Sequence, residues 1–316
     1  MNQKTMQRVF LNVLLFVTAV VLCALPFFVL PQNKVYVYTK NIYPDSREDG
    51  FVKQLQKIGY RVYINKEPSR QEEVAIWFKS FASVPSKEAK AKFNYNFIYS
   101  EDYSVILSSY LDKNFIILTP YVEIYEHYMR SNIKSAMFYL GVNTKDFTYL
   151  AKNKKYMLTY YELRNKNTLL IDYLKKDKDV QFVGKFWNNN HKEKASYRDI
   201  ARKENKLLND SFAVIVDNTK NPNLIPEELI RATMSGALVL TNKTSSVYDM
   251  YKENLVYYEN KEDIKHILSY YKKHKGLVEN KTKEALNVTI NKMSSSSSAK
   301  RFDELLNWLK KSNNKQ

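Results

Sequence analysis

Acidic and amide side chains gather at the two ends of one loop in the second half of the sequence. Asp217 and Asn218 follow an apolar run, and Glu227 and Glu228 come directly after Pro226. Carboxylates and amides accept hydrogen bonds from the hydroxyls of a sugar or a ribose, and a carboxylate can also take a proton from an attacking hydroxyl. The loop is therefore a candidate binding edge, provided that the surrounding elements bring these side chains together.

The residues around the loop predict a βαβ unit. Residues 212–216 and 237–241 read as buried strands, and a short helix opens at Glu227, with Pro226 before it and Gly236 just after its end. Ligands of parallel sheets bind beyond the carboxyl ends of the strands, where loops meet helix N-termini. Every α/β protein contains such units, so the pattern alone leaves a purely structural role open.

Several residues of this unit recur in order in a known family: Phe212, Asp217-Asn218, Pro226-Glu227-Glu228, Ala232 and Gly236. They resemble the F-x-x-x-x-E-N…T-E-K…A-x-x-x-G pattern of fucosyltransferases, and also the spore-maturation-type group, both in the C-terminal domain of GT-B glycosyltransferases. The resemblance implies that Asn218, Glu227 and Glu228 face a nucleotide sugar. Glu228 departs from it, because both groups carry there a basic residue that faces the donor's phosphates.

Basic residues in two other loops are candidates for binding that diphosphate. Arg164 and Lys166 lie between a predicted strand at 155–160 and a predicted helix at 168–174, and Lys185 follows a predicted strand at 180–183. Guanidinium and ammonium groups stabilise a diphosphate alongside a helix N-terminus. The Arg-Asn pair at 164–165 resembles the fucosyltransferase pattern, which implies that Arg164 contacts donor phosphate.

A carboxylate from the first half of the chain should accept the proton of the acceptor hydroxyl in an inverting reaction. Glu73, Glu101 and Glu123 are the candidates, and no spacing selects among them. The four histidines lack metal-ligand spacing, and there is no clear D-x-D. We therefore expect no metal and no cofactor, with a GDP- or UDP-linked sugar as the co-substrate.

The N-terminal residues predict a membrane anchor. Lys4 and Arg8 precede residues 9–30, in which Asn12 and Thr18 are the clearly polar positions and which also hold the single Cys23. This length suffices to cross a bilayer as a helix, and no convincing cleavage site follows. We read 1–8 as a short basic tail and 9–30 as a single-pass signal-anchor; the side of the membrane that the rest of the chain faces stays open.

Strands that alternate with helices along the remaining chain predict two Rossmann-like domains, the α/β architecture of GT-B enzymes. We assign 34–145 to an N-terminal acceptor domain, 146–293 to a C-terminal donor domain, and 294–316 to a serine linker, Ser294 to Ser298, with a last helix. A net charge of +17 suits an anionic partner. Nucleic acid is not expected, because the aromatic residues occupy core-like positions.

The sequence thus predicts a membrane-anchored glycosyltransferase that transfers a sugar from a nucleotide sugar to a glycan or glycolipid acceptor. A second reading is a degenerate GT-B domain that binds a glycan, lipid or protein without catalysis, and the acidic Glu228 favours it.

Overall fold

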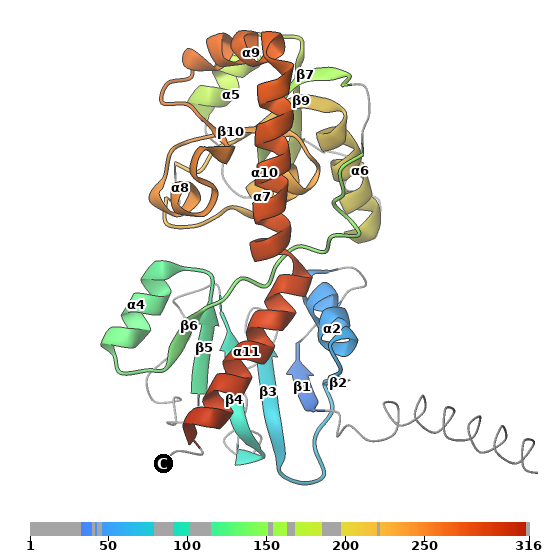
Figure 1. The fold of residues 1–316 in the computed structure, drawn as a ribbon, viewed down its shortest axis with the longest axis vertical. Helices are drawn as coiled ribbons and strands as arrows, with labels where there is room; N and C mark the ends of the chain where they lie inside the picture. Colours follow the sequence, from blue (N-terminus) through green and yellow to red (C-terminus); the bar gives the residue numbers. More distant parts are fainter. Residues whose placement is uncertain are drawn as a thin grey trace, which may run out of the picture.

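The computed structural model describes residues 33–39, 42, 46–78, 91–100, 115–150, 154–162, 168–184, 197–219 and 222–313. Two parallel sheets form two domains, one above the other in Figure 1. The last two helices run along them, the first beside the upper domain and the second beside the lower one. This arrangement confirms the two α/β domains that the alternation of strands and helices predicts. Within the described residues no helix has both the length and the apolar character needed to cross a bilayer. The predicted anchor at 9–30 lies outside them.

The N-terminal sheet has the strand order β2-β1-β3-β4-β5-β6. Its strands are β1 (Lys34–Tyr38), β2 (Arg61–Ile64), β3 (Glu72–Phe78), β4 (Phe93–Tyr99), β5 (Phe115–Thr119) and β6 (Ser135–Met137), and its helices include α2 (Arg47–Lys57) and α4 (Val122–Arg130). β5 is buried along its whole length, and so are residues 74–78 of β3 and 96–99 of β4, which is expected of strands covered on both faces.

The C-terminal sheet has the order β11-β10-β9-β7-β8. Its strands are β7 (Tyr156–Glu162), β8 (Val180–Gly184), β9 (Ser211–Val216), β10 (Leu238–Thr241) and β11 (Val256–Tyr257). Its helices are α5 (Thr168–Leu174), α6 (Tyr197–Asn209), α7 (Glu227–Met234), α8 (Ser245–Tyr251), α9 (Asp263–Lys273) and α10 (Lys275–Met293). The βαβ unit predicted around the loop is confirmed as β9, α7 and β10, and α7 begins at Glu227 as expected.

The chain crosses between the domains twice, and the two crossings touch. The Val142 amide donates to the Met293 carbonyl at 2.9 Å, and the Ser295 amide donates to the Val142 carbonyl at 3.1 Å. Gly141 has a φ of +80°, and a Cβ there would lie 2.5 Å from the carbonyl carbon of Ser294. The left-handed backbone and the close approach both require glycine. The predicted domain boundary near 145 lies at this crossing.

The serine run is not a linker, which corrects the sequence prediction. It forms the first turns of α11 (Ser295–Asn313), and the Ser297 amide donates to the Ser294 hydroxyl as in an N-terminal cap. Ser295 and Ser298 are buried, and the Ser298 hydroxyl donates to the Tyr139 carbonyl at 2.6 Å. Burial against the crossing therefore overrides the low helix propensity of serine.

Helix α11 belongs to the N-terminal domain although it ends the chain. Phe302 is fully buried, and its ring meets those of Phe51 and Phe97 at centroid distances of 6.0 and 5.0 Å. Leu306 and Leu309 join the same core, at helical spacing from Phe302. The final helix thus fills one face of the first sheet (Figure 1).

Candidate functional site

The carboxyl ends of the two sheets face one another across a cleft. A small cavity of about 40 Å³ opens between them. The N-terminal domain contributes Arg47, Tyr99, Tyr121 and Tyr139 to its lining, and the C-terminal domain contributes Leu224, Ile225, Glu227 and Ile230. Ligands of open parallel sheets bind at this edge, so the cavity lies where the topology predicts a site.

The strand order of the C-terminal sheet locates the expected ligand site more closely. In the C-terminal sheet the chain starts at β7, moves outward to β8, and then returns to the other side with β9. The crevice at such a reversal is the usual ligand site of doubly wound sheets. Here it lies between the end of β7 at Glu162 and the loop 217–226 that follows β9.

Glu227 lines the cleft. It is the first residue of α7, and its side chain is 12% exposed. One carboxylate oxygen lies 3.8 Å from the guanidinium of Arg47, the first residue of α2 in the other domain. The N-termini of two helices from different domains therefore meet here through an ion pair.

Arg231 fixes Glu227 from the interior side. One turn further along α7, its Nε and Nη2 donate to Glu227 Oε1 at 3.1 and 2.5 Å, and its Nη1 donates to Glu204 Oε2 at 2.7 Å. The guanidinium also lies 4.9 Å from the centre of the Phe147 ring. A buried guanidinium between two carboxylates balances their charge and locks the rotamer of Glu227.

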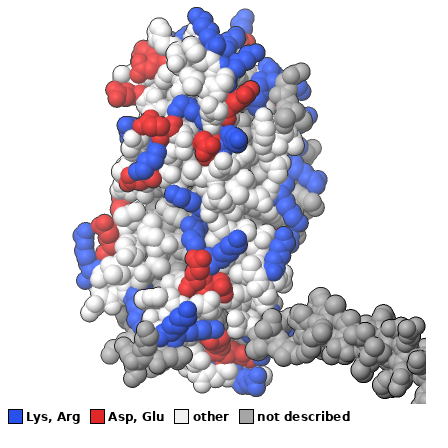
Figure 2. Space-filling view, viewed as in Figure 1, with Lys and Arg blue, Asp and Glu red and all other residues white. Residues whose placement is uncertain are grey.

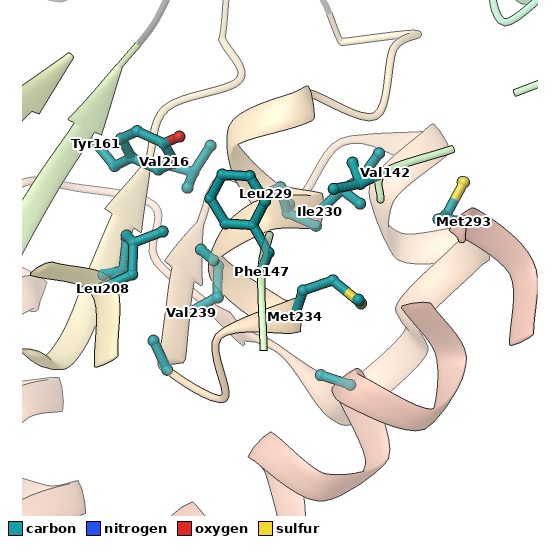
Figure 3. Close-up of a cluster of buried hydrophobic side chains, with 14 of the residues drawn as sticks. Val142, Phe147, Tyr161, Leu208, Val216, Leu229, Ile230, Met234, Val239 and Met293 are labelled. Carbon is teal, nitrogen blue, oxygen red and sulfur yellow. The ribbon is translucent and has the colours of Figure 1, made fainter. Parts of the chain in front are cut away.

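Tyr161, near the end of β7, completes this network. Burial raises the pKa of Tyr161 well above its ordinary value, Arg231 beside it lowers the pKa, and Glu204 raises it. The phenol therefore stays protonated and donates to Glu204 Oε2 at 3.0 Å. Figure 3 shows Tyr161 and Phe147 with the apolar side chains of α7. The charged network is thus enclosed by the hydrophobic core of the C-terminal domain.

Asn218 shapes the loop. Its amide nitrogen Nδ2 donates to the Leu224 carbonyl at 2.8 Å and to the Thr244 hydroxyl at 3.2 Å, and its backbone amide donates to Asn242 Oδ1. Asp217 accepts from the backbone and side chain of Thr219 at the loop's exposed turn. The buried Asn218 therefore holds the loop that carries α7 into the cleft.

Glu228 is buried on α7, with 6% of its surface exposed. Its charge contributes to the raised pKa of Tyr161. The structure therefore buries this carboxylate within the C-terminal domain.

Two of the candidates for the catalytic base, Glu123 and Glu73, lie at opposite edges of the N-terminal sheet. Glu123 lies in the first turn of α4, next to the cavity residue Tyr121, and accepts a hydrogen bond from Asn223 of the opposite domain. Glu73 lies at the start of β3, at the other end of the sheet, and pairs with Lys310 at 2.8 Å. Parallel strands present their starts and ends at opposite edges, so Glu73 does not reach the cleft. Glu101 lies outside the described residues.

The predicted phosphate ligands Arg164, Lys166 and Lys185 also lie outside the described residues. Their loops follow β7 and β8, whose carboxyl ends are at the cleft edge. Among the residues that the structure describes, no cluster of histidine, cysteine or acidic side chains could hold a metal ion.

The sequence analysis missed Arg47, Glu204 and Arg231. A signal existed for Arg231, because Glu227 precedes it by one helical turn and such pairs form ion pairs on helices. No local signal links Arg231 to Glu204, since that contact depends on how α6 packs against α7. Arg47 reads as an ordinary first-turn residue until the two domains are brought together.

Comparison with known proteins supports the fold. Neither protein-family models nor curated proteins match the sequence. The chain is similar to HepE from Anabaena in complex with UDP-glucose, with a TM-score of 0.50 and 10% identity over 87% of this chain and 99% of that one. It is also similar to a DNA-modifying β-glucosyltransferase studied with and without uridine diphosphoglucose, with a TM-score of 0.59 and 12% identity over 87% of this chain and 99% of that one. A glycosyltransferase from Rickettsia africae has a TM-score of 0.54 and 10% identity over 88% of this chain and 98% of its own. The chain therefore has the two-domain α/β fold of these proteins, which is of the GT-B type.

Proposed function

We propose that the protein is a glycosyltransferase that takes a sugar from a nucleotide-linked donor and attaches it to a glycan or glycolipid, with residues 9–30 as its membrane anchor. One observation carries the proposal. Glu227 lines an interdomain cavity and is held there by Arg231 of its own helix and by Arg47 of the other domain. A carboxylate fixed in this way accepts hydrogen bonds from vicinal hydroxyls without reorganising.

The cavity has the composition expected of a sugar site. Tyr99, Tyr121 and Tyr139 from the N-terminal domain offer aromatic faces and hydroxyls, and Glu227 lies opposite them. Apolar walls with a small number of fixed polar groups are typical of small-ligand pockets. In this proposal the tyrosine side receives the acceptor, and the α7 side receives the donor.

The proposed reaction is a displacement at the anomeric carbon. An acceptor hydroxyl forms the new bond to that carbon, the bond to the diphosphate oxygen breaks, and the nucleoside diphosphate leaves with the bonding electrons. The acceptor proton passes to a carboxylate, for which Glu123 at the mouth of the cleft is the candidate within the described residues. The negative charge of the leaving diphosphate is stabilised by Arg164, Lys166 and Lys185, as the resemblance to fucosyltransferases implies.

The similar structures indicate which donor to test first. HepE and the β-glucosyltransferase were solved with UDP-glucose. A UDP-linked sugar is therefore the first candidate for this chain, and a GDP-linked sugar, which the resemblance to fucosyltransferases favours, is the second.

A degenerate binding domain is the competing function, and Glu228 is the observation that favours it. A buried carboxylate stands where the fucosyltransferase pattern has a basic residue that faces the donor's phosphates. Repulsion between this carboxylate and a diphosphate would weaken donor binding.

Thermal unfolding of the full-length protein with UDP, GDP, CMP and ADP in turn tests the proposal. A ligand at about a hundred times its dissociation constant adds roughly 2.7 kcal/mol to the stability. We expect a shift with one nucleotide, and we expect Glu227→Gln to abolish it. The matched control is Glu126→Gln, which changes an exposed glutamate in the middle of α4. No shift with any nucleotide at millimolar concentration would instead support the binding domain.

A further inference from the structure

The amino ends of the N-terminal sheet form a surface opposite to the cleft. All pairs in this sheet are parallel, so every strand starts at the same edge. Helix α2 ends here at Lys57, and Asn313 at the end of α11 donates to the Tyr95 hydroxyl near the start of β4 at 3.1 Å. We define the amino edge as the starts of β1 to β6 together with the last turns of α2 and α11.

Basic side chains predominate at the amino edge. They are Lys34, Lys57, Arg61, Arg70, Lys92, Lys134, Lys310 and Lys311, whereas the acidic side chains beside them are Glu67, Glu72 and Glu73. In Figure 2, Lys and Arg side chains lie at the lower end of the N-terminal domain near the end of α11, with acidic side chains next to some of them. Such an edge attracts an anionic surface.

Two large apolar side chains are exposed among these charges. Trp308 is 62% exposed on α11, and Ile58 is 39% exposed directly after Lys57. Trp308 lies outside the helix face that carries Phe302 and Leu306 into the core. Tryptophan together with lysine and arginine is the usual composition of a surface that lies at the boundary between lipid and water.

The placement of this edge at a membrane rests on the proposed function, in which residues 9–30 anchor the chain: such an anchor would bring the edge to the lipid. The Asn33 carbonyl accepts from the Arg61 amide at 3.0 Å, so the described chain begins at the amino edge. The apolar segment proposed as the anchor ends at residue 30. Three extended residues span at most about 10 Å, so an anchor in the bilayer holds the edge within that distance of the lipid surface.

We infer that the amino edge docks onto anionic lipid headgroups, with Trp308 and Ile58 in the interfacial layer and the cleft directed away from the membrane. Lysine and arginine near an anionic leaflet gain electrostatic free energy that falls off within a Debye length. The anchor alone leaves the domain free to tilt, and the charged edge gives it one orientation. This orientation is independent of any reaction in the cleft.

Lysine labelling of the full-length protein tests the inference. The protein is placed in nanodiscs of phosphatidylcholine alone, or of equal parts phosphatidylcholine and phosphatidylglycerol, and treated with an amine-reactive reagent before mass spectrometry. We expect labelling of Lys57 and Lys311 to fall by about threefold or more in the anionic discs and to recover in high salt, because the attraction is screened. Lys272 and Lys273 on α9, at the opposite end of the molecule in Figure 1, should label equally in both.

A charge-reversal variant and a fluorescence measurement complete the test. Lys57→Glu, Arg61→Glu and Lys311→Glu together should remove the difference between the two kinds of disc, whereas Lys272→Glu with Lys273→Glu should leave it unchanged. Lipids brominated near the headgroup should quench Trp308 fluorescence in the anionic discs only. Equal labelling of Lys57 in both discs, or an equal decrease at Lys272, would overturn the inference.

Discussion

Replacing Arg231 with methionine tests the buried charge network. Arg231 and its partner Glu204 have side chains that are only 7% and 9% exposed, and the guanidinium also bonds Glu227. Methionine fills a similar volume but leaves two carboxylates without their shared cation. Removing one partner of a buried ion pair costs about 3–5 kcal/mol. For a domain of this size, each kcal/mol lowers the melting temperature by roughly 2–4 °C, so we expect a decrease of about 6–20 °C.

The assay must report the C-terminal domain by itself. Hydrogen exchange of the β9 and α7 amides as a function of denaturant does so, because these elements form its core. The chain offers a matched control: Arg130 and Glu126 form the same one-turn pair on α4 at 3.0 Å, with side chains 80% and 52% exposed. We expect Arg130→Met to change stability by less than about 0.5 kcal/mol.

A second substitution separates lost charge pairing from lost packing. Adding Glu204→Gln to Arg231→Met removes one of the two stranded carboxylates, and we expect it to restore about 1–3 kcal/mol. A loss below about 1 kcal/mol in Arg231→Met would refute the reasoning, and so would a double variant less stable than the single one. Either result would mean that the network does not hold Glu227 in place.

Three further predictions concern the N-terminal domain and the crossing. Phe302→Ala should lower the free energy of unfolding by about 3–5 kcal/mol, measured by urea denaturation, because it opens a cavity in a closed aromatic cluster. Gly59→Ala should lower the free energy of unfolding by only about 1–2 kcal/mol, since Gly59 has a φ of +99° but nothing lies within 4 Å of the added Cβ. Gly141→Ala should prevent stable expression, because there the added Cβ also meets the backbone of Ser294. Equal effects of the two substitutions would contradict this reading. Burial and the bond to Asp303 raise the pKa of Tyr60, so its contribution to stability is complete below about pH 10 and is lost as the pH rises through the folded value. Tyr60→Phe should therefore lessen the alkaline decrease in melting temperature, and an unchanged pH profile would contradict it.

Local patterns were sufficient for the elements around the loop. Residues 212–216 are apolar between turn residues, and Glu227 follows a proline, so both the strand and the start of α7 could be predicted. Strand direction could also have excluded Glu73, because it precedes its strand's apolar run and therefore lies at the amino end.

Other features depend on contacts between distant residues. Serine composition predicts a linker at Ser294 to Ser298, but burial against residues 139–143 makes it helical. The pairing of Arg231 with Glu204 joins two helices whose packing no local pattern encodes. The contact between Arg47 and Glu227 arises only when two separately folded sheets meet. These three features therefore depend on long-range contacts, which the periodicity of the sequence does not encode.

The position of α11 has a consequence for biosynthesis. The core of the first domain needs Phe302, Leu306 and Leu309, which leave the ribosome after the whole second domain, whereas the core of the second domain is complete once Met293 has emerged. Domains of a nascent chain ordinarily fold from the N-terminus onward. Here the order is inverted: the first domain keeps an open hydrophobic face until α11 has emerged. A premature stop or C-terminal trimming near residue 300 would therefore cripple the domain that was synthesised first.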